Sequence, residues 1–598
     1  MIEFAQIAPP EADLINLLPA GLLTILPGFV AEGETPTVLY RDSQGTLFIE
    51  EYAVSNDVER PFENVLSAVN APRLEKNLAE IVSAGFLGLG PVVPIVNERE
   101  GERGALALPT DKDLPQGTML ETEVGIIDAG IAFWNPAFRD SEGQSRFKTV
   151  GALSLIDKSF ASSPPLMPDD VHLFQSRPDA ENRRDLAELF PQSVFADTSP
   201  RKLFPTNGLA HGTAMADLVL STARHDVDLH ALELPVSVLR DLSGGQMSVV
   251  LEPALRALLE QIENHRRDQG KLVPFRAVIL LAFAFTGGPL DGSADVLSGM
   301  EEVLDVYSER QYNIELILPV GNHLQDQLHA VLEPESQVGW RVLPDDHSAN
   351  TVEILHGGDP SHIGLTTPGG VQVQLPAAAG LYRMHLDGRD VGAVWTRDRD
   401  DGSWNSRISL APSASRVRGR PTAPCGRWTM STADTDALCW VLRDETGFEA
   451  DPFEPARASW LEDADYRIRD RIGEPGRVSD LLLAGGREAK VRREETGSIL
   501  ASSKNAQVTV VTAQEEDGRA AYYAGHLAPG APAPQTLKLS VGLGPGVAKE
   551  IAPIGPFDGR AVLGNAGPQR FRALGTSMAA ALLAGQQTHT GGAPIQHI

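Results

Sequence analysis

Two runs of almost entirely apolar residues most constrain the fold of this chain. Ala277–Phe285 contains no polar side chain, and Ile314–Val320 contains a single charged one. Each run follows a segment with the apolar spacing of an amphipathic helix, at Val249–His265 and Ala294–Glu309. Strands that are apolar on both faces and alternate with helices indicate a parallel sheet covered by helices on both sides. We therefore predict an α/β fold.

Polar residues follow these strands at the points where the strands should end. A third short apolar strand, Glu123–Ile127, leads into Asp128, and Asn322 follows Ile314–Val320. In open α/β sheets, functional residues gather at the carboxyl ends of the strands. His211 and Ser577 instead lie at the start of predicted helices. We expect all four side chains to meet at one edge of the sheet.

These four residue types suit acyl transfer. Ser577 is the candidate nucleophile, His211 the candidate base that takes its proton, and Asp128 the carboxylate that orients the imidazole. The Asn322 amide and the Ser577 backbone N–H are candidate donors to the oxyanion. Each residue alone also fits a helix cap or a turn, so the prediction depends on all four occurring together.

The segments around these residues carry a resemblance to a known family. Val124–Gly130, continuing through Asn135–Phe138, is similar to the aspartate motif of the subtilisin-like serine peptidases. His211–Ala216 resembles their histidine motif, Gly575–Ala579 matches their serine motif, and Asn322 lines up with their oxyanion asparagine. The resemblance implies a subtilisin-like parallel sheet and an Asp-His-Ser endopeptidase that needs no cofactor. We name no metal ligands.

The same resemblance implies a substrate-binding cleft along two strands. Its expected lining consists of Leu280, Leu281, Ala282, Phe283, Ala284, Pro319, Val320 and Gly321. Ala282-Phe283-Ala284 departs from the family's usual Ser-Leu-Gly, so cleavage specificity does not transfer. Ala129 also replaces the hydroxyl residue that usually follows the aspartate.

The composition of the chain changes along its length and indicates an inserted domain. Six of the seven tryptophans fall between Trp340 and Trp460, among strand-length segments separated by turns. Short strands at this spacing predict a small β-sandwich. The expected units are an N-terminal α+β region with a linker at 1–117, a catalytic domain at 118–338 and 499–598, and an inserted all-β domain at 339–498. The polar segment Asp157–Gly208 is expected to be a surface excursion.

The first unit is predicted to fold separately from the sheet. Thr37–Tyr40 and Thr46–Tyr52 fit a hairpin, Phe62–Phe86 has helical apolar spacing, and Asn97–Gly117 fits an exposed linker. We expect this region to act as an inhibitory or prodomain-like segment, or as a docking unit for a regulatory partner. The inserted domain at 339–498 is a second candidate for substrate selection or partner binding.

The net charge and the cysteine content indicate which partners and which cellular compartment suit this chain. The 598 residues carry a net charge of −29, which disfavours nucleic acid and anionic membranes as partners. Only Cys425 and Cys439 are present, so either one bridge or two reduced thiols are open, and we favour reduced thiols in a cytoplasmic protein.

The sequence thus predicts a cytoplasmic serine endopeptidase that acts on protein or peptide substrates. One alternative is a catalytically silent binding or scaffold protein that uses the same fold, which the substitutions at Ala129 and Ala282–Ala284 motivate. A second alternative is an ester hydrolase or transpeptidase that uses the same four groups.

Overall fold

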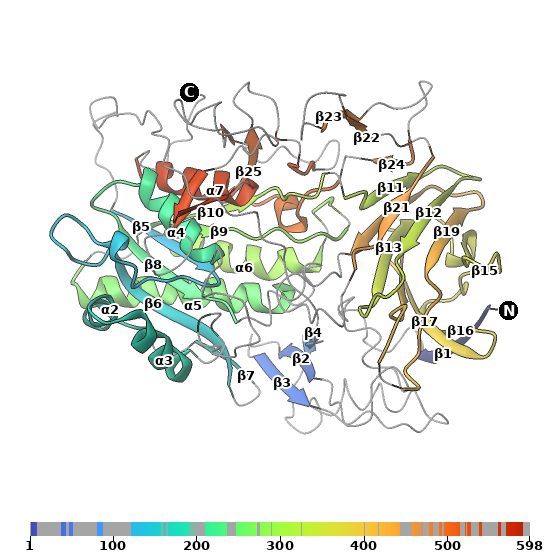
Figure 1. The fold of residues 1–598 in the computed structure, drawn as a ribbon, viewed down its shortest axis with the longest axis horizontal. Coiled ribbons are helices and arrows are strands. Elements are labelled where there is room, and N and C mark those ends of the chain that lie inside the picture. The colour runs from blue at the N-terminus through green and yellow to red at the C-terminus, as the bar shows by residue number, and fades with distance from the viewer. Residues whose placement is uncertain are drawn as a thin grey trace.

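The computed structural model contains two main bodies, an α/β unit and an all-β unit, which lie side by side (Figure 1). With short gaps, it describes residues 121–195, 210–235, 247–442, 457–470 and 489–527 and the shorter stretches 2–8, 37–42, 47–51, 81–87, 478–481, 537–540, 560–563, 570–573 and 575–589. The expected linker at Asn97–Gly117 lies outside these described residues.

The α/β unit is built on an eight-stranded sheet. Its strands, in spatial order, are β26 (Leu537–Ser540), β25 (Val508–Gln514), β10 (Asn313–Pro319), β9 (Arg276–Leu281), β5 (Thr122–Asp128), β8 (Asp228–Glu233), β6 (Phe147–Ile156) and β7 (Ser159–Ser162). All neighbours are parallel except β6 and β7. The carboxyl ends of β5, β8, β9 and β10 therefore lie along one edge of the sheet, as the sequence predicts.

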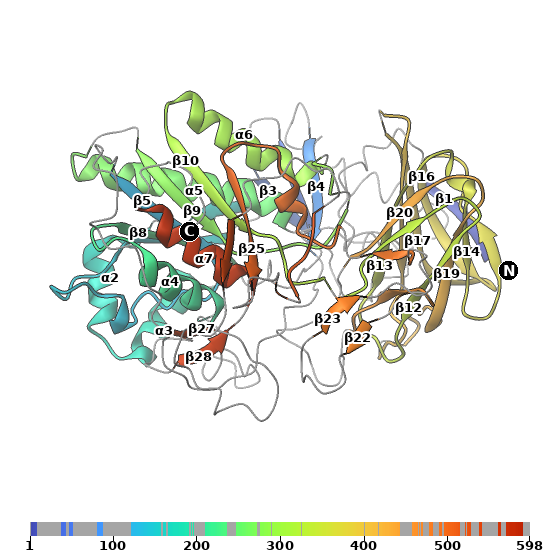
Figure 2. The ribbon, with the colours of Figure 1, turned by 90° about the horizontal axis from the view of Figure 1, so that it is seen from above.

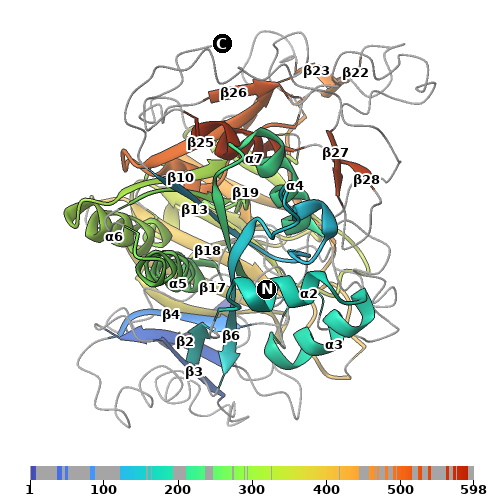
Figure 3. The same cartoon turned by 90° about the vertical axis from the view of Figure 1, so that its left-hand side faces the viewer.

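Helices cover both faces of this sheet, which confirms the predicted fold class (Figure 3). On one face lie α4 (His211–Thr222) and α7 (Thr576–Gln587), and on the other lie α5 (Met247–Asp268) and α6 (Asp295–Glu309). The short helices α2 (Pro168–Gln175) and α3 (Asp179–Leu189) lie outside β6 and belong to the predicted excursion. The bounds of α5 and α6 agree closely with the two helices that the apolar spacing predicts.

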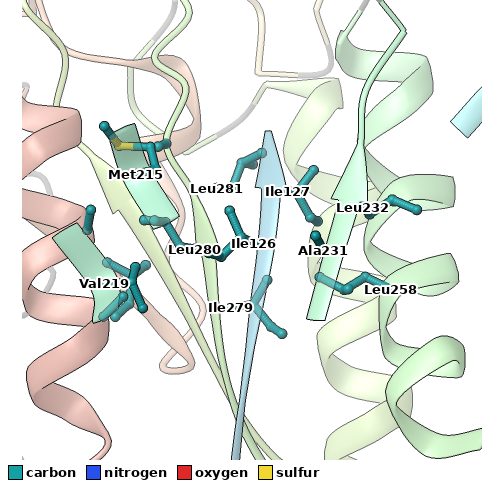
Figure 4. Packing of buried hydrophobic residues seen from close by; sticks show 14 of the residues in the cluster. Ile126, Ile127, Met215, Val219, Ala231, Leu232, Leu258, Ile279, Leu280 and Leu281 are labelled. Carbon is teal, nitrogen blue, oxygen red and sulfur yellow. The ribbon is translucent and has the colours of Figure 1, made fainter. Parts of the chain in front are cut away.

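The core of the α/β unit explains why the strands are apolar throughout. Figure 4 shows side chains of β5, β8 and β9 between Met215 and Val219 of α4 and Leu258 of α5. All of these side chains are fully buried. Burying each large aliphatic side chain stabilises the fold by about 1.5–3 kcal/mol, so a strand with both faces covered can carry almost no polar residue.

The all-β unit is a sandwich of two antiparallel sheets, as predicted. One sheet has the order β1 (Ile2–Ala8), β16 (Gly380–Leu386), β17 (Arg389–Asp398), β18 (Trp404–Leu410), β13 (Asn350–His356), β20 (Ala437–Leu442), β11 (His329–Leu332) and β24 (Val491–Arg492). The other has the order β15 (Gln372–Gln374), β14 (Ile363–Thr366), β19 (Gly426–Thr432), β12 (Gln337–Val342) and β21 (Trp460–Glu462). Trp340 and Trp428 lie fully buried between them.

The described parts of the N-terminal region join the sandwich through β1 and form a small sheet of their own. Strand β1 pairs antiparallel with β16, so the beginning of the chain extends a sheet of the sandwich. The predicted hairpin is confirmed by β2 (Thr37–Asp42) and β3 (Leu47–Glu51). The helical spacing predicted through Phe86 is wrong over its last residues, because β4 (Ile81–Leu87) is a strand that pairs with the other edge of β2. The domain boundaries stay a prediction.

A few small elements complete the described structure. They are the hairpins β22 (Ile468–Asp470) with β23 (Val478–Leu481) and β27 (Arg560–Leu563) with β28 (Arg570–Ala573), and the 3-10 helices η3 (Pro136–Phe138), η5 (Pro360–His362) and η7 (Ile499–Ser502). Cys425 is exposed and Cys439 buried, and the two thiols are not bridged.

Candidate active site

The candidate carboxylate and the candidate base are in direct contact. Asp128 is the last residue of β5 and is fully buried, and His211 is the first residue of α4. The His211 Nδ1 lies 3.0 and 2.9 Å from the two carboxylate oxygens of Asp128. The Ala129 N–H donates to Asp128 Oδ1 at 2.7 Å, which fixes the carboxylate against its own loop. This pair can hold one tautomer of the imidazole and stabilise its protonated form.

The contact requires a glycine directly after the histidine. A Cβ on Gly212 would lie 2.9 Å from the Ala129 carbonyl oxygen and 3.1 Å from the Asp128 Cβ. Without that Cβ, the Gly212 N–H donates to the Ala129 carbonyl at 2.9 Å. The next residue, Thr213, donates its N–H and its hydroxyl to the Gly130 carbonyl at 3.0 and 2.7 Å. The start of α4 is thereby bonded to the loop that follows Asp128.

The charge of Asp128 changes the basicity of His211. Burial lowers the pKa of the imidazole, but the negative charge of Asp128 and its hydrogen bond outweigh burial, so the pKa is raised above 6.5. About a third of the His211 side chain remains exposed, which leaves the ring accessible from one side. A partly exposed imidazole with a raised pKa suits a group that accepts and returns a proton near neutral pH.

The candidate nucleophile lies in the first turn of α7. Ser577 is buried except for 8% of its surface, and its hydroxyl donates to the Ala282 carbonyl at 2.8 Å. Phe283 follows Ala282 in the chain, and its ring centroid lies 5.6 Å from that of the His211 ring. The segment after β9 therefore contacts both Ser577 and His211. The Ser577 hydroxyl is bonded to this segment and not to the imidazole in this state.

The two helices that carry Ser577 and His211 are packed against each other (Figure 2). The Thr222 hydroxyl of α4 donates to the Leu582 carbonyl of α7 at 2.9 Å. Gly585 allows this close crossing, because a Cβ there would lie 2.3 Å from the Val219 carbonyl oxygen. The packing fixes the orientation of the base relative to the nucleophile.

The candidate oxyanion donor is attached to the same helix end. Asn322 follows β10 and is exposed. Its Oδ1 accepts from the Thr576 N–H at 2.8 Å and from the Thr576 hydroxyl at 3.0 Å, so Nδ2 is left to donate to another acceptor. Gly575 has φ +149°, and a Cβ there would lie 3.3 Å from Nδ2. The first N–H groups of a helix lack intrahelical acceptors, so the Ser577 N–H is a second available donor.

The expected cleft residues divide into three groups. Leu280 and Leu281 are fully buried in the core, both edges of β9 are paired, and their assignment to the cleft stays a prediction. Phe283 and Ala284 are half-buried and follow the end of the strand, whereas Ala282 is almost fully buried. The predicted strand Ala277–Phe285 is thus shorter than expected, because the chain leaves the sheet after Leu281.

Pro319 ends β10, and Pro319, Val320 and Gly321 are all buried. The Ser498 N–H donates to the Val320 carbonyl at 2.6 Å, and the Gly525 N–H donates to the Gly321 carbonyl at 2.9 Å. The Gly321 N–H donates to the Thr576 hydroxyl at 3.1 Å. The backbone N–H and carbonyl groups of Val320 and Gly321 are therefore already bonded within the protein.

Sequence reasoning missed two groups next to the site. Glu233 ends β8 beside Asp128, and its carboxylate accepts from the Gly130 N–H at 3.0 Å. Ser498, on the return from the all-β unit, accepts from the Phe285 N–H through its hydroxyl at 3.1 Å. The position of Glu233 at the carboxyl end of a neighbouring parallel strand was a usable signal. Nothing in the local sequence points to Ser498.

No group of three or more histidine, cysteine or carboxylate side chains suited to a metal ion occurs within the described parts of the chain. In those same parts, no helix combines the length and the apolar character that a bilayer crossing requires.

Comparison with known proteins finds likenesses among solved structures and no sequence match. No family model matches the chain, and no curated protein matches it. Among solved structures, the CspB protease of Clostridium perfringens is similar, with a TM-score of 0.48 and 13% identity over 79% of this chain and 81% of that one. At that level of likeness, the functional argument rests on the residues of the site.

Proposed function

We propose that this chain is a subtilisin-type serine endopeptidase that hydrolyses peptide bonds of protein substrates. The observation that carries the proposal is the buried Asp128 carboxylate bonded to His211 at 2.9 Å, together with the segment after β9 that contacts both His211 and Ser577. A lone histidine at a helix start gives no such inference, whereas a buried carboxylate on its Nδ1 prepares its other nitrogen to act as a base.

The proposed reaction uses four groups of the chain. The Ser577 hydroxyl exchanges its bond with the Ala282 carbonyl for one with His211 Nε2, which takes the proton as the oxygen attacks the scissile carbonyl. Asp128 stabilises the imidazolium that forms. Asn322 Nδ2 and the Ser577 N–H donate to the oxyanion, and His211 then protonates the leaving amine. A water deprotonated by His211 releases the acyl group.

The proposal extends to the setting of the enzyme. Two unbridged cysteines suit the reducing cytoplasm. A net charge of −29 disfavours nucleic acid and anionic membranes as partners, and the proposed substrates are proteins or peptides. Residues 1–117 and 339–498 are the proposed surfaces for a regulatory partner.

Active-site labelling tests the proposal. The purified full chain is treated with a fluorophosphonate probe and assayed in parallel on a denatured protein substrate. We expect labelling and cleavage in the wild type, and neither in Ser577→Ala. His211→Ala keeps the serine but removes the base, so its labelling is expected to fall by several orders of magnitude. Equal labelling of wild type and Ser577→Ala would contradict the proposal.

One observation favours a second candidate, a catalytically silent binding protein with this fold. Ser577 is only 8% exposed, and its hydroxyl is bonded to the Ala282 carbonyl. A silent protein would bind peptides without cleaving them or reacting with the probe.

Substrate mixtures that contain both peptides and esters distinguish an endopeptidase from an ester hydrolase with the same groups.

A further inference from the structure

Glu233 is a buried carboxylate next to the candidate triad that the proposed reaction does not use. It ends β8, is 1% exposed, and is the register partner of Asp128 on β5. Its Oε1 accepts two hydrogen bonds, one from the Gly130 N–H at 3.0 Å and one from the Ser193 hydroxyl at 2.7 Å. Burying a carboxylate costs free energy unless its oxygens accept hydrogen bonds. Losing either of these two contacts would therefore be unfavourable.

The first contact fixes the loop that carries Asp128. Gly130 has φ +73°, a left-handed conformation that reverses the chain two residues after Asp128. Helix α4 binds the carbonyl groups of this loop, through Gly212 and Thr213. Glu233 accepts a hydrogen bond from the Gly130 N–H of the same loop. The loop is thus held between the helix that carries His211 and the strand next to Asp128.

The second contact connects the same carboxylate to the excursion between β7 and α4. Ser193 follows α3, and its hydroxyl also accepts from the Phe195 N–H at 3.1 Å. The Phe195 ring packs edge-on against Trp134 at 5.1 Å. A Cβ on Gly130 would lie 3.9 Å from the Phe195 ring. The end of the excursion therefore packs on the Asp128 loop.

We propose that Glu233 is a positioning residue: by accepting from Gly130 and Ser193, it holds Asp128 in contact with His211 and couples this contact to the excursion. The inference rests on the proposed function for its kinetic consequences. It does not require Glu233 to touch the substrate or the reacting atoms.

A set of four variants tests the role. Glu233→Ala removes the acceptor, Glu233→Gln keeps an Oε1 acceptor but removes the charge, and Ser193→Ala removes only the link to the excursion. Glu315→Ala is the matched control, because Glu315 is a mostly buried carboxylate on β10, bonded to Arg276 and Thr509 near the opposite edge of the sheet. Each variant is measured for kcat, KM, melting temperature and the pKa of His211 by NMR.

We expect Glu233→Ala to lower kcat about 10–100-fold with little change in KM, since small displacements of catalytic groups have effects of this size. The His211 pKa should fall toward its ordinary value as Asp128 moves away. Glu233→Gln should restore both, and Ser193→Ala should show a smaller loss in kcat. Glu315→Ala should lower the melting temperature and leave kcat and the His211 pKa unchanged.

Three results would overturn the inference. The first is a Glu233→Ala variant that loses stability but keeps its kcat and its His211 pKa. The second is a Glu233→Gln variant as impaired as Glu233→Ala, which would assign the effect to charge. The third is a Glu315→Ala variant with the same loss in kcat. The NMR measurement needs no substrate, so it judges the role of Glu233 even if the wild type cleaves no peptide.

Discussion

At the scale of single residues, the protonation of His211 sets the expected pH dependence. The imidazole must be neutral to accept the Ser577 proton, and Asp128 holds its pKa above 6.5. We therefore expect kcat/KM to fall as the pH drops through a midpoint above 6.5. A pH–rate profile on a peptide substrate measures this limb. An acid limb centred below the ordinary histidine value would contradict the assignment.

The same shift makes a linked prediction for stability. Because the pKa of His211 is higher in the folded protein than in the unfolded chain, the Asp128–His211 pair stabilises the fold fully below pH 6.5. This contribution is lost as the pH rises through the folded-state value. In Asp128→Asn the pKa should fall and the contribution should disappear, which melting temperatures across the pH range detect.

Asn322 has two separable roles, and two substitutions distinguish them. Asn322→Ala removes both the Nδ2 donor and the acceptor for Thr576, whereas Asn322→Asp keeps an oxygen for the Thr576 N–H but replaces the donor with a negatively charged oxygen. Loss of an oxyanion donor lowers kcat by about 10²–10³-fold, and we expect this in both variants. Only Asn322→Ala should also lose thermal stability. Normal kcat in Asn322→Asp would contradict the oxyanion role.

At the scale of elements, the crossing of α4 and α7 determines whether the site is assembled. In Gly585→Ala, the new Cβ would lie 2.1 Å from the Thr222 hydroxyl and 2.3 Å from the Val219 carbonyl oxygen, so the helices must separate. We expect a destabilisation of about 1–3 kcal/mol, the usual cost of overpacking, and a lower kcat.

The control for this variant is Gly369→Ala in the sandwich, where a Cβ would meet only Thr367 Oγ1 at 3.8 Å. It should leave melting temperature and kcat near the wild type. A Gly585→Ala protein with unchanged stability and activity would show that the close crossing is not required.

The sequence predicted the strands and helices of the α/β unit well, because apolar runs such as Ile314–Val320 have one physical explanation in a soluble protein. The pairing of Asp128 with His211 was likewise predictable from strand ends and motif order. The strand break after Leu281 was not, since the residues that continue the apolar run bond to Ser577 and Ser498, distant in the sequence. The strand at Ile81–Leu87 was missed because apolar spacing is ambiguous over so short a segment.

At the scale of the whole molecule, both ends of the sandwich segment lie next to the residues that follow β10. The chain leaves the α/β unit just after Asn322, and on its return Ser498 bonds to Val320 and Phe285. The hydrogen bonds of Ser498 thus connect the end of the sandwich segment to the residues next to the candidate site.

We expect Ser498→Ala to lower kcat and to destabilise the protein by about 1–3 kcal/mol, because the buried Phe285 N–H loses its acceptor. Ser502→Ala is the matched control, since its hydroxyl bonds only within its own turn, to the Ile499 carbonyl at 2.7 Å. It should keep the wild-type kcat. Equal kcat in the two variants would remove the argument for a connection through Ser498.

The pairing of β1 with β16 has a consequence for any cleavage of the chain after its N-terminal region. A cut between residues 97 and 117 would sever the peptide backbone but leave Ile2–Ala8 hydrogen-bonded along the sandwich edge. The released piece would copurify with the remainder as a nicked complex, and it would separate only under denaturing conditions. Size-exclusion profiles alone would then report an intact protein, whereas a denaturing gel would reveal two fragments.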